Sequence, residues 1–243
     1  MVSFVVRAAA RSDRGLVRSG NEDAVYAGTR LLALADGMGG HAGGEVASAL
    51  MIAALTPLDA QAHADPVASL NAAVHAGNAA IGERAAATAD LEGMGTTVTA
   101  ILFGDNGFGL AHLGDSRGYR LRGGELSRLT RDDTFVQSLV DAGHLTSAEA
   151  ASHPRRSVIL QAATGAEIEP TLTFHEALVG DRYLLCSDGL TDLVDDATLA
   201  ETLREYEQVA DCADRLVALA LAAGGSDNVT VVVADVENAP AAP

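Results

Sequence analysis

The sequence has little of three features that would mark common functional classes. It holds only 16 Lys and Arg against 33 Asp and Glu, a formal net charge of −17, which disfavours nucleic acid and anionic membranes as partners. Its two cysteines, Cys186 and Cys212, lack zinc-ligand spacing and suit a reducing compartment. No apolar run approaches the ~18 residues of a membrane helix, and the N-terminus lacks a signal pattern. We therefore expect a cytoplasmic protein with no membrane segment, and a monomer.

Nothing in the composition divides the chain into separate domains. No internal repeat or shift in composition occurs, and 48% of the residues are hydrophobic, which is ample for a sizeable core. We expect one domain over residues 1–236. The Pro/Ala-rich tail, residues 237–243, is typical of linker material.

Short β-type runs punctuated by glycine dominate the chain. Asn106-Gly107 between two apolar runs indicates a hairpin, so we expect antiparallel pairing rather than a purely parallel Rossmann sheet. The expected strands are 24–29, 31–35, 96–103, 107–113, 118–121, 125–129, 182–187 and 229–235. Helical spacing predicts two helices within 45–88 and others near 135–143, 199–203 and 209–222. Residues 131–165 lack strand signals and are expected to form a surface insertion.

The stretch "LLALADGMGGHAGGE", residues 31–45, runs from an apolar segment through Asp36 into a loop that is nearly all glycine. Ordered glycine is costly in conformational entropy, so the cluster indicates a close approach to the main chain by a phosphate, a metal or a tight turn. The stretch fits neither G-x-G-x-x-G nor the lysine-ending P-loop, which disfavours a nucleotide site.

Four aspartates share one sequence context. Asp36, Asp115, Asp188 and Asp227 each lie where a strand-like run meets a small-residue loop. Carboxylates gathered at one rim repel one another unless cations lie between them, and oxygen ligands without His or Cys select Mg²⁺ or Mn²⁺. The alternative is that each is an ordinary turn residue.

Six stretches, in order and spanning nearly the whole chain, carry a family resemblance. They are "SDRGLVRSGNEDAVY", "LLALADGMGGHAGGE", "GMGTTVTAILF", "HLGDSRGY", "LLCSDGLTD" and "GGSDNVTVVVADV". Together they resemble the PPM, or type 2C, metal-dependent serine/threonine protein phosphatases, above all actinobacterial members that oppose eukaryotic-type kinases. The resemblance implies an α+β fold, a layered αββα arrangement with a central β-sandwich of two antiparallel sheets flanked by helical pairs. It makes residues 131–165 the flap.

The resemblance also implies a metal site. Asp36 would bridge two Mg²⁺ or Mn²⁺ ions, the Gly37 carbonyl would reach the second, and Asp188 and Asp227 would complete the shell of the first. Asp115 and Asp192 match positions that hold a third, weaker metal.

Further positions would support the chemistry. Glu22, Asp23 and Asn228 would orient metal-bound waters from outside the ligand shell. Arg18 has the planar fork that suits two phosphate oxygens, the alternative being a surface charge. Arg155 and Arg156 on the flap would contact substrate or be plain surface charges.

The implied reaction is attack on phosphorus by a hydroxide that bridges two cations about 3.5–4 Å apart. Some family members carry a histidine two residues after the bridging aspartate as the acid for the leaving group. Here that position is Met38, so His41 and metal-bound water stay as alternatives.

The sequence and its family resemblance leave three functions to consider. The leading one is hydrolysis of phosphoserine and phosphothreonine in proteins, with Ser/Thr kinases and their substrates as partners. A silent phosphopeptide-binding module is disfavoured because Asp36, Asp188 and Asp227 are all present. A narrow phosphatase for a partner-switching regulator is not separable from the first by sequence.

Overall fold

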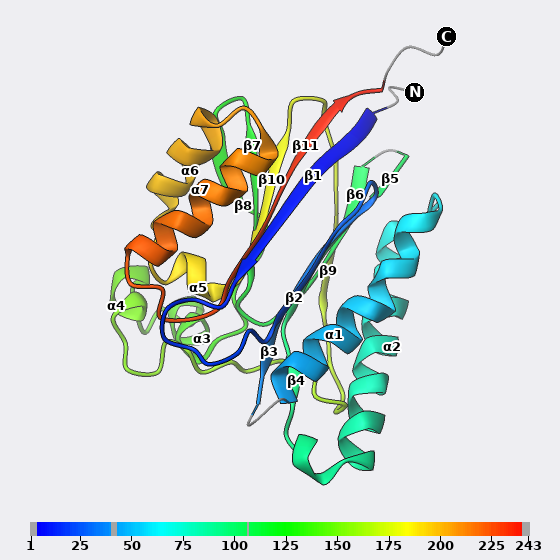
Figure 1. Cartoon of the computed structure of the whole chain (residues 1–243), viewed down its shortest axis with the longest axis vertical. Helices are drawn as coiled ribbons and strands as arrows, with labels where there is room; N and C mark the ends of the chain where they lie inside the picture. Colours follow the sequence, from blue (N-terminus) through cyan, green and yellow to red (C-terminus); the bar gives the residue numbers. More distant parts are fainter. Residues whose placement is uncertain (1–3, 40–42, 106, 240–243) are drawn as a thin grey trace.

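Two antiparallel β-sheets face each other between two helical pairs in the computed structural model, which describes residues 4–39, 43–105 and 107–239 (Figure 1). One sheet has the order β1 (Phe4–Asp13), β11 (Val229–Asn238), β10 (Arg182–Cys186), β7 (Arg117–Arg122) and β8 (Glu125–Arg128). The other has the order β2 (Asp23–Ala27), β3 (Leu31–Met38), β5 (Val98–Gly104), β6 (Gly107–Leu113) and β9 (Thr171–His175), with β4 (Gly95–Thr96) paired to β3. The α+β sandwich expected from the sequence is confirmed.

Helices cover the outer face of each sheet. On the β3 side lie α1 (Gly43–Leu55) and α2 (Pro66–Ala87), followed by the short 3₁₀ turns η1 (Thr56–Ala60) and η2 (Ala89–Leu91), respectively. The other sheet carries α6 (Asp196–Glu205) and α7 (Val209–Ala222). Three short helices complete the set: α3 (Phe135–Asp141), α4 (Ser147–Ala151) and α5 (Asp188–Thr191). In the described residues, none of the helices has the length and hydropathy that a bilayer crossing requires.

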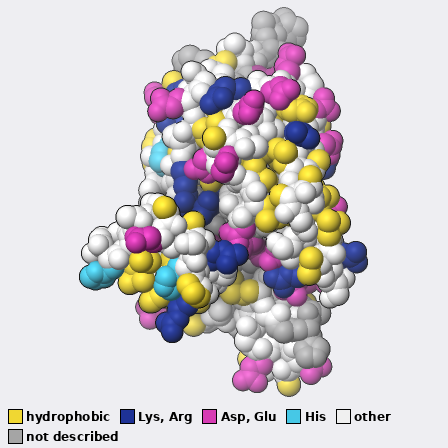
Figure 2. Space-filling model, turned by 90° about the vertical axis from the view of Figure 1, so that its left-hand side faces the viewer, with side chains coloured by type: hydrophobic (Ala, Val, Ile, Leu, Met, Phe, Trp, Pro, Cys, Tyr) yellow, Lys and Arg dark blue, Asp and Glu magenta, His cyan; other side chains and the backbone are white. Residues whose placement is uncertain are grey.

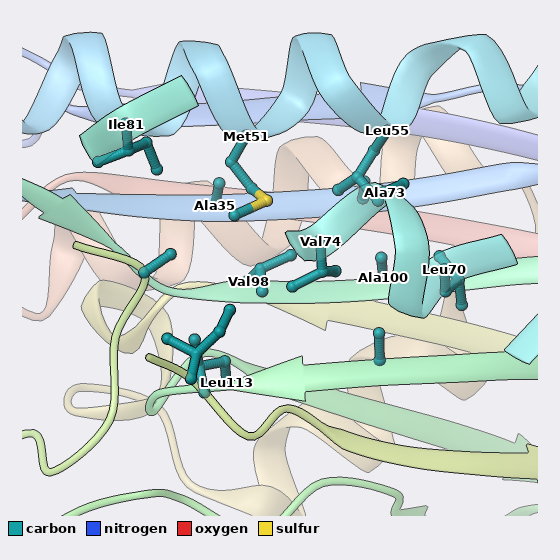
Figure 3. Packing of buried hydrophobic residues seen from close by; sticks show 14 of the residues in the cluster. Ala35, Met51, Leu55, Leu70, Ala73, Val74, Ile81, Val98, Ala100 and Leu113 are labelled. Atoms are coloured by element: carbon teal, nitrogen blue, oxygen red, sulfur yellow. The ribbon is translucent and has the colours of Figure 1, made fainter. Parts of the chain in front are cut away.

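The buried side chains form three layers that explain the uninterrupted apolar runs. On β3, Leu31, Ala33 and Ala35 pack against α1 and α2, whereas Leu32 and Leu34 point between the sheets. Figure 3 shows the outer layer, where Met51 and Leu55 of α1 lie above Ala35, Val98 and Ala100. A strand buried on both faces reads as a continuous hydrophobic run because both sets of alternating side chains leave water.

Two strands were not expected from the sequence. In β1, the run "FVVRAAARSD" mixes alanine and arginine because it is an edge strand that is only partly buried. The five-residue β9 is likewise an edge, partly exposed strand. The expected β5–β6 hairpin is confirmed, although its Asn106 lies outside the described residues.

The first and last described strands lie side by side. β1 pairs with β11 over ten residues, from Phe4↔Asn238 to Asp13↔Val229. Both described chain ends therefore lie at the same end of the sandwich (Figure 1), and Val229 lies at the other.

Candidate functional site

The strand register brings two carboxylates together between the sheets. Asp36 has the same parity on β3 as Leu32 and Leu34, so its side chain points inward. Asp23 is its direct partner on β2 and therefore projects from the same face. The sequence predicted Asp36 as a site residue, but only the register explains why Asp23 accompanies it.

Asp23 also joins the two sheets at this rim. Its Oδ2 accepts a hydrogen bond from Ser187 Oγ at 3.0 Å, and that hydroxyl accepts one from the Thr230 amide at 3.0 Å. Its Oδ1 is buried without a hydrogen-bond partner. A buried, unpaired carboxylate oxygen is costly, which indicates that a cation or ordered water belongs beside it.

The remaining predicted aspartates approach from the other sheet and its connections. Asp188 begins α5 directly after β10, Asp227 lies just before β11, and Asp115 lies between β6 and β7. With Asp36 and Asp192 they line one pocket of about 410 Å³, whose other walls include Arg18, Glu22, Gly37, Arg156, Ser157 and Ile159. Figure 2 shows acidic side chains near the middle of this face, with arginine side chains beside them.

A larger hollow of about 650 Å³ lies at the opposite end of the sandwich, around Arg182. There Arg182 makes two hydrogen bonds to Asp235, at 2.6 and 2.7 Å, so these charges are already matched. The smaller carboxylate pocket is the candidate site because Asp36, Asp115 and Asp188 form no ion pair with an arginine of the described residues.

Crowding and burial disfavour the ionised form of these carboxyls. Burial, followed by repulsion from Asp115, Asp192 and Asp227, raises the pKa of Asp188 to about 8. Burial and then repulsion from Asp132 raise the pKa of Asp115 to about 6. The pKa of Asp36 is raised well above its ordinary value by burial and the charge of Asp23.

These residues fit a divalent cation in chemistry, since they offer several carboxylates and, beside them, the orphaned buried oxygen of Asp23. Among the described residues that line the pocket, none is a competing His or Cys. As the side chains lie, no three acidic, His or Cys groups of the described residues close around one point. One reason is visible at Asp227, whose Oδ2 lies 2.6 Å from Nη2 of Arg18. An arginine therefore neutralises one predicted ligand.

A second arginine makes a similar contact from the flap. Arg156 Nη2 lies 3.3 Å from Oδ2 of Asp192, the exposed residue predicted at the third metal position. Arg18 and Arg156 thus both line the pocket, Arg18 from the loop before β2 and Arg156 from the flap. Arg155 has no lining role there; its guanidinium lies 5.5 Å from the ring centre of Phe135.

Asn228 holds the loop that carries Arg18. Its Nδ2 donates to the carbonyls of Arg14, at 2.9 Å, and Gly20, at 2.8 Å, while its Oδ1 accepts from the Glu22 amide at 2.8 Å. The side chain is buried, so these three bonds are shielded from water. Asn228 therefore positions the Arg18 loop and Glu22 together.

The glycines after Asp36 are required by the protein's own backbone. A Cβ atom on Gly37 would lie 2.2 Å from the Gly44 carbonyl and 2.4 Å from the Glu22 carbonyl. Gly44 in turn leaves space for the Glu22 carboxylate, 2.1 Å from where its Cβ would be. The close approach expected from the glycine cluster is thus found between three segments of the chain.

His41, a candidate acid, lies outside the described residues. Another histidine was missed by sequence reasoning, although "LAHLG" shows it alone in an apolar strand. His112 is buried; its Nδ1 lies 2.9 Å from Thr99 Oγ1, and its Nε2 lies 3.0 Å from the carbonyl of Arg131. Burial lowers its pKa. It therefore ties β6 to the start of the flap as a neutral hydrogen-bonding group.

Comparison with known proteins gives one consistent group. The family profile "Protein phosphatase 2C" matches residues 17–223. The chain is 64% identical, over 97% of its length, to the serine/threonine protein phosphatase PstP of Mycobacterium tuberculosis, and 33% identical, over 93%, to the serine/threonine phosphatase stp of Listeria innocua. It spans 46% of the length of the M. tuberculosis protein and 94% of the Listeria protein.

Solved structures agree with these relatives. A crystal structure of M. tuberculosis PstP superposes with a TM-score of 0.94 at 64% identity, covering 96% of this chain and all of that one. A PstP catalytic domain in complex with two manganese ions gives a TM-score of 0.92 at 62% identity, covering 97% and 100% of the two chains.

Proposed function

Because the chain belongs to the protein phosphatase 2C family of serine/threonine phosphatases, we propose that it hydrolyses phosphoserine and phosphothreonine in proteins, using divalent cations at the rim of its sandwich. The carrying observation is the convergence of Asp36, Asp115, Asp188 and Asp227 on one pocket. Burial and mutual repulsion raise the pKa of the first three of these carboxyls. Such a cluster is stable as carboxylates only with cations. The two manganese ions in a relative of 62% identity support this reading.

We assign the protein ligands as follows. Asp36 and Gly37 line the pocket from β3, and Asp188 and Asp227 line it from the other sheet. The three carboxylates and the Gly37 carbonyl would hold two Mg²⁺ or Mn²⁺ ions. Asp115 and Asp192 would hold a third, weaker ion, because Asp192 is exposed and fewer protein ligands meet there. When bound, such cations make water a nucleophile near neutral pH and offset phosphate charge.

The chain's own residues bind and orient the substrate. Arg18 would leave Asp227 for the phosphate, because cations on Asp227 would take over the neutralisation of that carboxylate. Asn228 keeps the Arg18 loop in place during this exchange, since its bonds are to backbone groups of the loop. Asp23 and Glu22 offer carboxylate oxygens beside the pocket that can hold ordered water.

We assign residues 1–236 as the phosphatase domain and residues 131–165 as its flap. Ser157 and Ile159 of this segment line the pocket, and its α3 and α4 stand apart from both sheets (Figure 1). The proposed substrates are phosphorylated Ser/Thr kinases and their targets in the bacterial cytoplasm. The kinds of relative that match support this class of substrate.

Metal removal tests the proposal. We expect hydrolysis of p-nitrophenyl phosphate and of phosphoserine peptides to disappear in excess EDTA and to return when Mn²⁺ exceeds the chelator. Elemental analysis must confirm that the chelated protein is free of metal. Full activity in that metal-free protein would contradict the proposal. Phosphopeptide binding in Mn²⁺ without phosphate release would instead identify a silent binding module.

A further inference from the structure

Two apolar side chains are exposed immediately before Arg18. Leu16 is 66% exposed and Val17 is 71% exposed, more than any other large hydrophobic side chain in the described part of the chain. Single exposed hydrophobic residues are common. Leu16 and Val17, however, are adjacent and directly precede Arg18, which lines the pocket, so they lie within reach of a peptide bound there. We name Leu16 and Val17 the loop rim.

The loop rim is held in place. The Leu16 amide donates to the carbonyl of Gly225 at 2.8 Å, and Asn228 binds the carbonyls of Arg14 and Gly20 on either side of the rim. These bonds fix the loop at both flanks and near its tip. The two side chains are therefore presented to water by an ordered backbone, and a ligand that covers them does not have to order the loop first.

The flap presents a second exposed apolar pair beside the same pocket. Val158 is 45% exposed and Leu160 is 55% exposed, and they alternate with Ser157 and Ile159, which line the pocket. This segment is also held, since the Leu160 amide donates to the carbonyl of Asp133 at 2.7 Å. We name Val158 and Leu160 the flap rim. Arg18 and Arg156 lie beside the two rims and line the same pocket.

We propose that the two rims bind apolar side chains that flank the phosphorylated residue of an extended phosphoprotein segment. The inference rests on the proposed function and names the sequence that the pocket prefers. A protein of net charge −17 repels acidic segments, so acidic flanking residues are disfavoured as a source of affinity. Apolar contacts with the two rims add affinity for the peptide to that which Arg18 and the cations supply for its phosphate.

Kinetics with matched substrates test this inference. The substrates are a phosphothreonine peptide with Leu and Val at the flanking positions, the same peptide with Ser and Gln there, and p-nitrophenyl phosphate. Wild-type protein with Mn²⁺ is expected to prefer the apolar peptide over the polar one by about tenfold in kcat/KM, mainly through KM. The variant Leu16→Ser/Val17→Ser is expected to lose most of this preference while its rates on the polar peptide and p-nitrophenyl phosphate change less than twofold.

A matched control exists at the far end of the sandwich. Leu178 and Val179 are also adjacent and exposed, at 42% and 39%, but lie just before Asp181, away from the pocket. Leu178→Ser/Val179→Ser is expected to keep the full preference. Val158→Ser/Leu160→Ser repeats the test on the flap rim without altering the Arg18 loop.

The outcomes separate the inference from the proposed function. No preference in the wild type, or a preference that survives both rim variants, would overturn the inference. An equal loss on all three substrates would also overturn it, because the loop would then act only through Arg18. Activity on p-nitrophenyl phosphate with none on either peptide would contradict the protein phosphatase function itself.

Discussion

The carboxylates at the two ends of β10 differ in whether an arginine neutralises them. At its start, Asp181 is almost fully buried, and its carboxylate meets Arg122 in two hydrogen bonds of 2.6 and 2.7 Å. Burial alone would raise the pKa of Asp181, but bonds from Arg122, the Leu178 amide and Tyr183 hold it below its ordinary value. At the other end, about 23 Å away along an extended chain, the pKa of Asp188 is raised to about 8.

The difference lies in the counter-ions. At the start of the strand the buried Asp181 is paired with Arg122, and the half-buried Asp235 is paired with Arg182. At the Asp188 end, five aspartates share a pocket with Arg18 and Arg156 only, and both arginines are more than half exposed. The excess of buried negative charge at the second rim supports the proposal that cations bind there.

The largest expected effect is on turnover at the unmatched end. Asp188→Asn removes a proposed ligand, so kcat/KM with Mn²⁺ should fall on the order of 10³-fold, or about 4 kcal/mol of transition-state stabilisation. Asp181→Asn, the same change at the matched end, should leave kcat/KM of the folded protein within twofold. Steady-state assays on p-nitrophenyl phosphate measure both. Similar losses from the two variants would remove the distinction between the ends.

For stability, we expect the larger loss at the Asp181 end of β10. Asp181→Ala leaves Arg122, the Leu178 amide and the Tyr183 hydroxyl without their acceptor, at an expected cost of about 3 kcal/mol in the free energy of unfolding. The loss should be the same with and without Mn²⁺, because this end holds no proposed ligand. Urea unfolding in both conditions checks it, and an unchanged midpoint would show that the ion pair contributes nothing net.

The smallest expected effect is a gain in the stability of the metal-free protein. In metal-free protein, Asp188→Asn should raise the free energy of unfolding by roughly 1–2 kcal/mol at pH 8 and by less at pH 5. The folded-state pKa is above the unfolded one, so the carboxyl's contribution is complete below pH 3.8 and is lost as pH rises towards about 8. The asparagine amide does not ionise in this range, so it does not carry this pH-dependent cost. A gain that is equal at both pH values would show that repulsion is not its source.

Sequence patterns predicted most of the fold and the aspartates, because both depend on local signals. The run "LLALA" indicates a strand buried on both faces, and Asp36 continues its alternation. β1 was not predicted because an edge strand that is only partly buried carries alanine and arginine without a strong pattern. The hairpin and the helical pairs followed from turn residues and helical spacing.

Contacts between distant segments could not be predicted. Asn228 binds Glu22 and the Arg14–Gly20 loop, which lie more than 200 residues away in the sequence. Arg18 and Asp227 are separated by a similar number of residues. The orphaned oxygen of Asp23 depends on the β2–β3 register, which no local signal fixes. Convergence of the aspartates is likewise a property of the packed sheets, because their sequence context alone is also that of ordinary turns.

The pairing of β1 with β11 has a mechanical consequence. Because Phe4 and Asn238 are partners, a pulling force applied between the two described ends would load the ladder at its first rung and not along its length. Antiparallel ladder bonds lie perpendicular to the strands, so they would open one after another, as in a zipper, at low force. The last rung to open would be Asp13 with Val229, next to Asn228, so tension on the ends would reach the carboxylate pocket only after nine other rungs had parted.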